Sequence, residues 1–185
     1  MRRVTGLFAM AVLCVAAAAC GASTPPQSGQ STSNQTSPAT PSAPSGSCPG
    51  AEKLSSATGL TFALSDTRKD HPLETLESVK ALVCLYTSAE STQSGGDPLV
   101  LRVDTVTGAD AATVRGKFES SCTDNGGSLA ASTVANAKIC TRNGTTIEGN
   151  LGSGDRSVDV YFVNADTTTA TTLTPSFDKV LTAMS

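Results

Sequence analysis

The cysteines constrain the possible folds of this 185-residue chain more than any other feature. Four of the six lie in the body of the chain: Cys48, Cys84, Cys122 and Cys140. Upstream, Arg2 and Arg3 precede an apolar run over 4–15 and then small residues, a pattern typical of a secretory signal peptide. Secretion would place the four cysteines in an oxidising compartment, where we expect them to form two disulfides.

Four cysteines allow three pairings. We predict the local pairing, Cys48 with Cys84 and Cys122 with Cys140, because each pair would then join a predicted helix end to the strand packed beneath it. Zinc binding is the alternative use of four thiols, but no C-x-x-C pair occurs and His71 is the sole histidine. We therefore expect neither a metal nor another cofactor.

The apolar run ends at Ala-Ala-Ala-Cys-Gly over residues 17–21. This segment resembles the type II signal peptide of bacterial lipoproteins, in which a peptidase cuts before a cysteine that carries diacylglycerol. The resemblance implies that residues 1–19 are removed by cleavage between Ala19 and Cys20, and that Cys20 is the lipid-attachment site. Cys14 is the rival position, but the bulky leucine before it does not fit the motif. The expected location is the extracytoplasmic face of the cell membrane.

Residues 20–47 are expected to form the lipidated cysteine and a disordered tether. From Gly21 to Ser47 the chain is almost wholly Ser, Thr, Pro, Gly, Gln, Asn and Ala, and it carries no charge. Such a composition cannot bury enough apolar surface to offset the entropy of ordering. The folded part is therefore predicted to span 48–185 as one disulfide-stapled domain.

Turn residues and hydrophobic periodicity divide this domain into short elements. Helices are predicted at 51–58, from Asp110 to the Asn125-Gly126-Gly127 segment, and after Thr174-Pro175. Strands are predicted at 59–65, 79–87, 98–106, 132–142, 145–151 and 157–164, with turns at 94–97, 143–144 and 152–155. The charged run 66–71 and Pro72 are expected to end the first strand, and no element is assigned to 166–172.

The later helices each show one apolar face, because their apolar residues recur every three or four positions. These residues are Ala111, Val114 and Phe118, and then Phe177, Val180, Leu181 and Met184. The element order α-β-β-β-α-β-β-β-α predicts the α+β class, with an antiparallel β-sheet packed by amphipathic helices.

The whole layout resembles the small cell-envelope lipoproteins of mycobacteria and related actinobacteria. Cys48-Pro49 and Cys84-Leu85-Tyr86 match the outline of those that have a PsbP-like α/β/α sandwich. In that outline a short helix follows the first cysteine and a strand carries the second. Gly46-Ser47 and Tyr86 stand where those families often have Asp-Pro and tryptophan. The resemblance implies a PsbP-like sandwich here, and extracellular sensor domains of actinobacterial receptor kinases are a similar alternative.

Composition and motifs argue against several functional classes. The net charge is −3 and no basic cluster follows the predicted anchor, so nucleic acid is not an expected partner. The chain lacks a Gly-x-Ser-x-Gly elbow, a Walker loop and a His-Glu-x-x-His motif. With a single histidine, a histidine-based triad has little to work with, and we expect the protein not to be an enzyme.

Several titratable residues are candidates for chemistry, and each has a plainer interpretation: a solvated loop histidine, a solvated charged face or, for the last pair, a turn. The candidates are His71 as a pH-responsive group beside Asp66 and Asp70, the carboxylate pairs Glu74/Glu77 and Asp104/Asp110, and Asp155/Asp159 as weak calcium ligands. We expect no acid–base chemistry from the two carboxylate pairs Glu74/Glu77 and Asp104/Asp110, because neither has a hydrophobic setting that would raise one carboxyl pKa.

Two functional classes remain. The first is a non-catalytic binding or accessory module of the cell envelope, held to the membrane by its lipid and docking an envelope protein or a glycolipid. The second is a carrier of lipid or of another small apolar ligand. A large apolar cavity between sheet and helices would favour the carrier.

Overall fold

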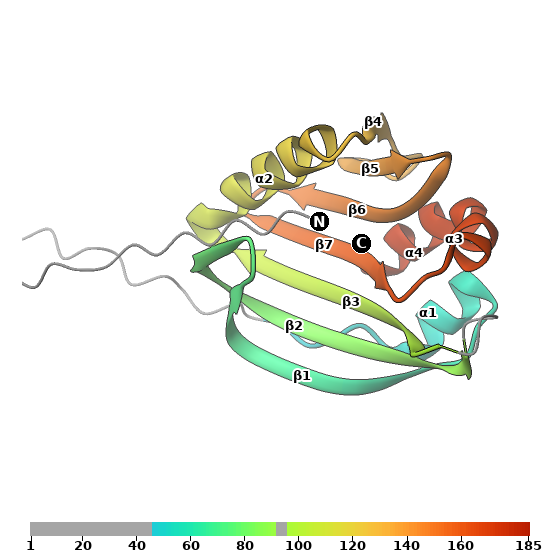
Figure 1. The fold of residues 1–185 in the computed structure, drawn as a ribbon. Helices are drawn as coiled ribbons and strands as arrows, with labels where there is room; N and C mark the ends of the chain where they lie inside the picture. The colour runs from blue at the N-terminus through green and yellow to red at the C-terminus, as the bar shows by residue number, and fades with distance from the viewer. Residues whose placement is uncertain (1–45, 92–95) are drawn as a thin grey trace, which may run out of the picture. The chain divides into compact units, whose positions relative to one another are not determined.

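A computed structural model describes residues 46–91 and 96–185 (Figure 1). The predicted signal peptide (1–19), the lipid site at Cys20, the tether as far as residue 45 and part of the predicted turn at 94–97 lie outside the described residues. Within the two described ranges, none of the helices is long and apolar enough to cross a membrane.

A seven-stranded antiparallel sheet forms the centre of the fold, in the order β1-β2-β3-β7-β6-β5-β4. Its strands are β1 (Phe62–Leu73), β2 (Leu76–Ser91), β3 (Pro98–Thr107), β4 (Ser128–Ala131), β5 (Ala137–Arg142), β6 (Thr145–Ser153) and β7 (Arg156–Val163). Two meanders, β1-β2-β3 and β4-β5-β6-β7, join where β3 pairs with β7 (Figure 1). This arrangement confirms the predicted α+β class; the PsbP-like sandwich stays a prediction.

Helices cover both faces of the sheet. They are α1 (Ala51–Thr58), α2 (Ala111–Asp124), α3 (Thr167–Leu173) and α4 (Phe177–Met184), with single 3-10 turns at Gly108–Asp110 and Thr174–Ser176. Successive side chains of β7 point to opposite faces of the sheet. Val158, Val160 and Phe162 belong to the core that includes α1 and α4, whereas Asp159 and Tyr161 lie on the α2 face.

The main core lies on the face covered by α1, α3 and α4. Leu54 of α1 and Leu181 of α4 are fully buried there. Phe177 packs edge-to-face on Phe162, with ring centroids 6.0 Å apart. This dense packing leaves the α2 face as the place where polar side chains enter the interior.

Two disulfides tie helix ends to the sheet. Cys48, just before α1, is bonded to Cys84 of β2, and Cys122 of α2 is bonded to Cys140 of β5. This is the pairing predicted from the sequence. Cys84 and Cys122 are fully buried, so both bonds are part of the packed interior.

The first strand runs much further than predicted. β1 continues through the charged run and Pro72 to Leu73, because it is an edge strand whose side chains are mostly exposed. Charged residues and proline are compatible with an edge strand, where one side has no ladder to complete. The pairing of β1 with β2 is irregular between Arg68 and His71, where Asp70 adopts φ 52°.

The second half differs from the prediction at two places. The predicted strand over 132–142 is a turn followed by β5, with β4 before it; Asn136 adopts φ 60° in that turn. Residues 166–172, left without an assignment, form α3, whose first turn is capped by the Asp166 side chain accepting from the Thr169 N–H at 2.7 Å. The predicted Asn143-Gly144 hairpin joins β5 to β6, and both residues have positive φ as a type I′ turn requires.

Candidate functional site

A half-open cavity of about 310 Å³ lies between α2 and the sheet, and we call it the α2 pocket. Its lining residues are Leu73, Glu74, Thr75, Leu76, Arg102, Asp104, Val114, Lys117, Phe118, Ser121, Ile147, Glu148, Asp159, Tyr161 and Phe162. Two other hollows, beside β4 and β5 and between α1 and α4, are more open to solvent. The α2 pocket therefore has the most enclosed shape of the three.

Strand register brings the polar floor of this pocket together. Asp104 of β3 lies directly opposite Asp159 of β7, and Arg102 lies opposite Tyr161. On the other side of β7, Asn150 of β6 lies opposite Asp159. Directly opposed positions on one face of a sheet place their side chains in contact range. Two carboxylates thus sit side by side under a helix.

Arg102 and Asp104 form a buried ion pair. The Arg102 Nε donates to both Asp104 oxygens at 2.9 and 3.1 Å, and its Nη1 donates to Glu74 Oε1 at 2.8 Å. The Arg102 and Asp104 side chains are 11% and 6% exposed, whereas Glu74 is 76% exposed. Burial nonetheless raises the pKa of Asp104, although the Arg102 contact opposes this.

Asp159 has no such partner in the described part of the chain. Its carboxylate accepts a short hydrogen bond from the Asn150 amide, which also donates to Ser157 Oγ at 2.7 Å. Burial is the main cause that raises the pKa of Asp159 to about 7, and the neighbouring Asp104 charge adds to it. Near neutral pH this carboxyl therefore exchanges between its neutral and charged forms.

Tyr161 presents an aromatic face and a hydroxyl to the same floor. The Arg102 guanidinium carbon lies 5.4 Å from its ring centroid, a cation–π distance. Burial is the main cause that raises the pKa of Tyr161, so its hydroxyl stays protonated at physiological pH. None of the described residues forms a hydrogen bond with this hydroxyl, so it is available to a ligand.

The walls of the pocket are largely apolar and come from two elements. Val114 and Phe118 of α2 form one side, and Leu73 and Leu76 at the end of the β1–β2 hairpin form the other. The arrangement can enclose a small molecule with both apolar and polar groups.

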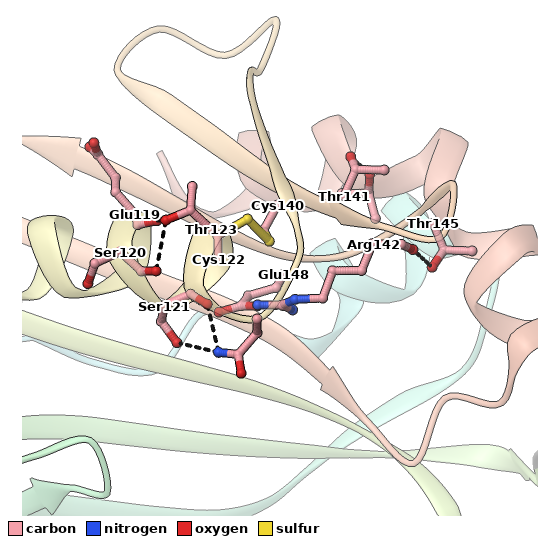
Figure 2. The surroundings of a disulfide bond; sticks show 12 residues. Glu119, Ser120, Ser121, Cys122, Thr123, Cys140, Thr141, Arg142, Thr145 and Glu148 are labelled. Atoms are coloured by element: carbon pink, nitrogen blue, oxygen red, sulfur yellow. Dashed lines mark hydrogen bonds and ion pairs between the residues drawn. A yellow bond between two sulfur atoms is a disulfide. The ribbon is translucent and has the colours of Figure 1, made fainter.

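The Cys122–Cys140 disulfide fixes the C-terminal end of α2 beside this pocket. Figure 2 shows the bond, with Arg142 and Glu148 next to the helix end. Arg142 Nη1 donates to Glu148 Oε2 at 2.7 Å, so this pocket-lining carboxylate already has a cationic partner. The disulfide joins α2 to β5, and the ion pair joins β5 to β6. Together they fix the position of α2 relative to the part of the pocket floor that β6 provides.

Replacing Cys122 and Cys140 together by alanine is expected to lower the free energy of unfolding by about 3 kcal/mol, since the bond closes a loop with sequence separation 18. Urea unfolding of the double variant measures this loss. Faster amide exchange in the last turn of α2 is expected as well. An unchanged unfolding midpoint would show that the bond does not constrain the chain.

The structure corrects several expectations about titratable residues. Asp104 is buried and has a raised pKa, so its predicted solvated setting is wrong. Its carboxylate neighbour is Asp159, which the sequence had grouped with Asp155. His71 lies on β1 rather than in a loop. Arg102 and Asp104 lie on one face of β3, as the alternation of polar and apolar residues over 98–106 implies.

The remaining candidates lie apart from one another. Glu74 binds Arg102 while Glu77 is exposed on β2, and Asp155 is exposed in the turn between β6 and β7. In residues 46–91 and 96–185, no group of three or more His, Cys, Asp or Glu side chains is arranged to hold a metal ion.

Comparisons of the chain with protein-family models, with curated proteins and with solved structures found no match.

Proposed function

We propose that this protein is a lipid-anchored, extracytoplasmic binding module of the cell envelope, without catalytic activity, and that its ligand occupies the α2 pocket. One observation carries the proposal. The pocket combines apolar walls with a floor where Asp159 and Tyr161 retain hydrogen-bonding capacity. The opposite face of the sheet is filled by side chains of α1 and α4.

A binding role suits the pocket better than a hydrolytic one. Ser121 is the serine that lines it, and the Ser121 hydroxyl contacts the Asn125 amide at 3.4 Å rather than a general base. A serine nucleophile needs an adjacent base to be activated. We therefore assign the neighbouring carboxylates of Asp104 and Asp159 to ligand recognition.

A carrier of lipid is the second candidate, and the apolar walls are the observation that favours it. An acyl chain laid on the floor, however, would cover the Arg102–Asp104 ion pair and the Asp159 carboxyl without offering them hydrogen bonds. Burying polar groups without partners is costly. We accordingly place the carrier second.

Native mass spectrometry of the full chain, purified from its membrane in mild detergent, separates the two candidates. The binding module is expected to retain a small molecule that carries a polar group, and the carrier a diacyl lipid. Ser121→Trp, which points a bulky ring into the pocket lining, is expected to displace the bound molecule. Ser120→Trp is the matched control, because Ser120 is exposed on the same helix and outside the lining. A lipid retained by both variants would contradict the proposal.

The proposed membrane anchor has its own test. Cys20→Ser is expected to abolish incorporation of a lipid probe and to move the protein from the detergent phase to the aqueous phase, because stable anchoring needs the acyl chains. Metabolic labelling and phase partitioning measure both effects. Continued labelling of the variant would reject Cys20 as the attachment site and point to Cys14.

A further inference from the structure

Acidic residues outnumber basic residues in the lining of the α2 pocket, and they differ in whether they form an ion pair. Four carboxylates line it, those of Glu74, Asp104, Glu148 and Asp159, whereas Arg102 and Lys117 are the cationic residues of the lining. Arg102 is engaged by Asp104 and Glu74, and Glu148 is engaged by Arg142. Asp159 is the carboxylate that receives only a neutral amide donor among the described residues. An anionic ligand would meet net repulsion there.

We propose that the α2 pocket binds a small organic cation, an ammonium or amidinium group on an apolar body, with Asp159 as its counter-ion. This inference deepens the proposed function and rests on it, because it names the ligand class for the same pocket. Charge complementarity is its first support: a cation would supply the cationic partner that Asp159 lacks among the described residues and would make a charge-assisted hydrogen bond.

The walls fit the apolar body of such a ligand. Phe118, Val114 and Leu76 offer hydrocarbon surface on the sides, while the floor is polar. The face of Tyr161 attracts cations, as its contact with Arg102 at 5.4 Å already illustrates. Its free hydroxyl can accept a second N–H of the ligand. A volume of about 310 Å³ is at the lower end for small-molecule sites and suits a compact ligand.

Three probes of nearly equal shape test the charge: 4-phenylbutylammonium, the neutral 4-phenylbutanol and the anion 4-phenylbutyrate. Each is titrated into the full chain in detergent, and affinity is measured by calorimetry at pH 8. The ammonium probe is expected to bind about tenfold or more tightly than the alcohol, since hydrogen bonds to charged groups are the stronger ones. The carboxylate probe is expected to bind most weakly.

Lowering the pH supplies a second readout. Because the pKa of Asp159 is about 7, its charge is largely lost at pH 5.5, whereas an alkylammonium remains charged. Affinity for the ammonium probe is therefore expected to fall roughly tenfold between pH 8 and 5.5. The charged groups facing Asp159 are Asp104 and Arg102 on β3, Glu148 on β6, Lys117 on α2 and Glu74 after β1.

Variants identify the responsible group. Asp159→Asn is expected to lower affinity for the ammonium probe about tenfold and to remove its pH dependence, with little effect on the alcohol. Asp155→Asn, an exposed carboxylate near the start of the same strand, is the matched control. The charge of His71 lowers the pKa of Asp104, so His71→Gln is expected to retain the pH dependence if Asp159 is the responsible group. If Asp159→Asn fails to fold, His71→Gln still tests the proposal, because loss of the pH dependence in this variant would assign it to His71 instead of Asp159.

The possible failures are distinguishable. If the alcohol or the anion binds as tightly as the ammonium probe, and Ser121→Trp blocks that binding, the pocket is a binding site but the cationic ligand class is wrong. Equal ammonium affinity in Asp159→Asn would also overturn the class. If Ser121→Trp affects none of the probes, the proposed function of the pocket itself is wrong.

Discussion

Asp159→Asn is expected to raise the free energy of unfolding at pH 8 by roughly 2 to 4 kcal/mol, because it removes a largely desolvated charge that has no cationic partner among the described residues. The folded-state pKa of Asp159 is about 7, above its ordinary unfolded value of about 3.9. The folded state therefore binds more protons than the unfolded state between these values, and wild-type stability falls as the pH rises through this window. Near pH 4 the gain from the substitution should vanish.

Urea unfolding of both proteins at pH 4, 6 and 8 measures this effect. Asp155→Asn makes the same chemical change at an exposed turn position and should leave the curves unchanged. A variant that is less stable than the wild type at pH 8 would show that the Asn150 hydrogen bond outweighs the desolvation of Asp159. A stabilising substitution is the pattern expected of a residue kept for binding rather than for folding.

Replacing Cys48 and Cys84 together by alanine is expected to lower the free energy of unfolding by about 4 kcal/mol, because the bond closes a loop with sequence separation 36. The loss should exceed that for Cys122 and Cys140, whose loop is shorter. Cys84 is fully buried beside the core, so the double alanine variant also leaves a small cavity.

Chemical denaturation of the two double variants under identical conditions gives the comparison. A larger loss from the Cys122–Cys140 pair would contradict the loop-length argument. It would place more of the stability at the end of α2 than at the start of α1.

Local patterns in the sequence determined which residues share a face of a strand. Alternation over 98–106 put Arg102 and Asp104 together, and the run Val158-Asp159-Val160-Tyr161 carries the same signal for β7. What alternation cannot provide is the pairing of β3 with β7, because these strands are separated by α2 and the β4-β5-β6 meander. The neighbouring carboxylates of Asp104 and Asp159 follow from that non-local pairing.

Sequence patterns also missed elements whose stability comes from position rather than composition. β1 carries a charged run because it lies at the edge of the sheet. The threonine-rich α3 has weak intrinsic helix propensity, and it is held by the Asp166 cap and by burial of Ala170 and Leu173. The disulfide pairs, in contrast, were predictable because cysteines close in the chain also lie at helix ends and on the strands beneath them.

Amide chemical-shift mapping with a library of small-molecule fragments tests most directly whether the α2 pocket is the binding site. We expect the largest shifts at pocket residues of α2, β3 and β7, with Val114, Phe118 and Tyr161 among them. These shifts should disappear in Ser121→Trp and persist in Ser120→Trp. Shifts confined to the open groove between α1 and α4, around Lys53 and Lys179, would contradict the account.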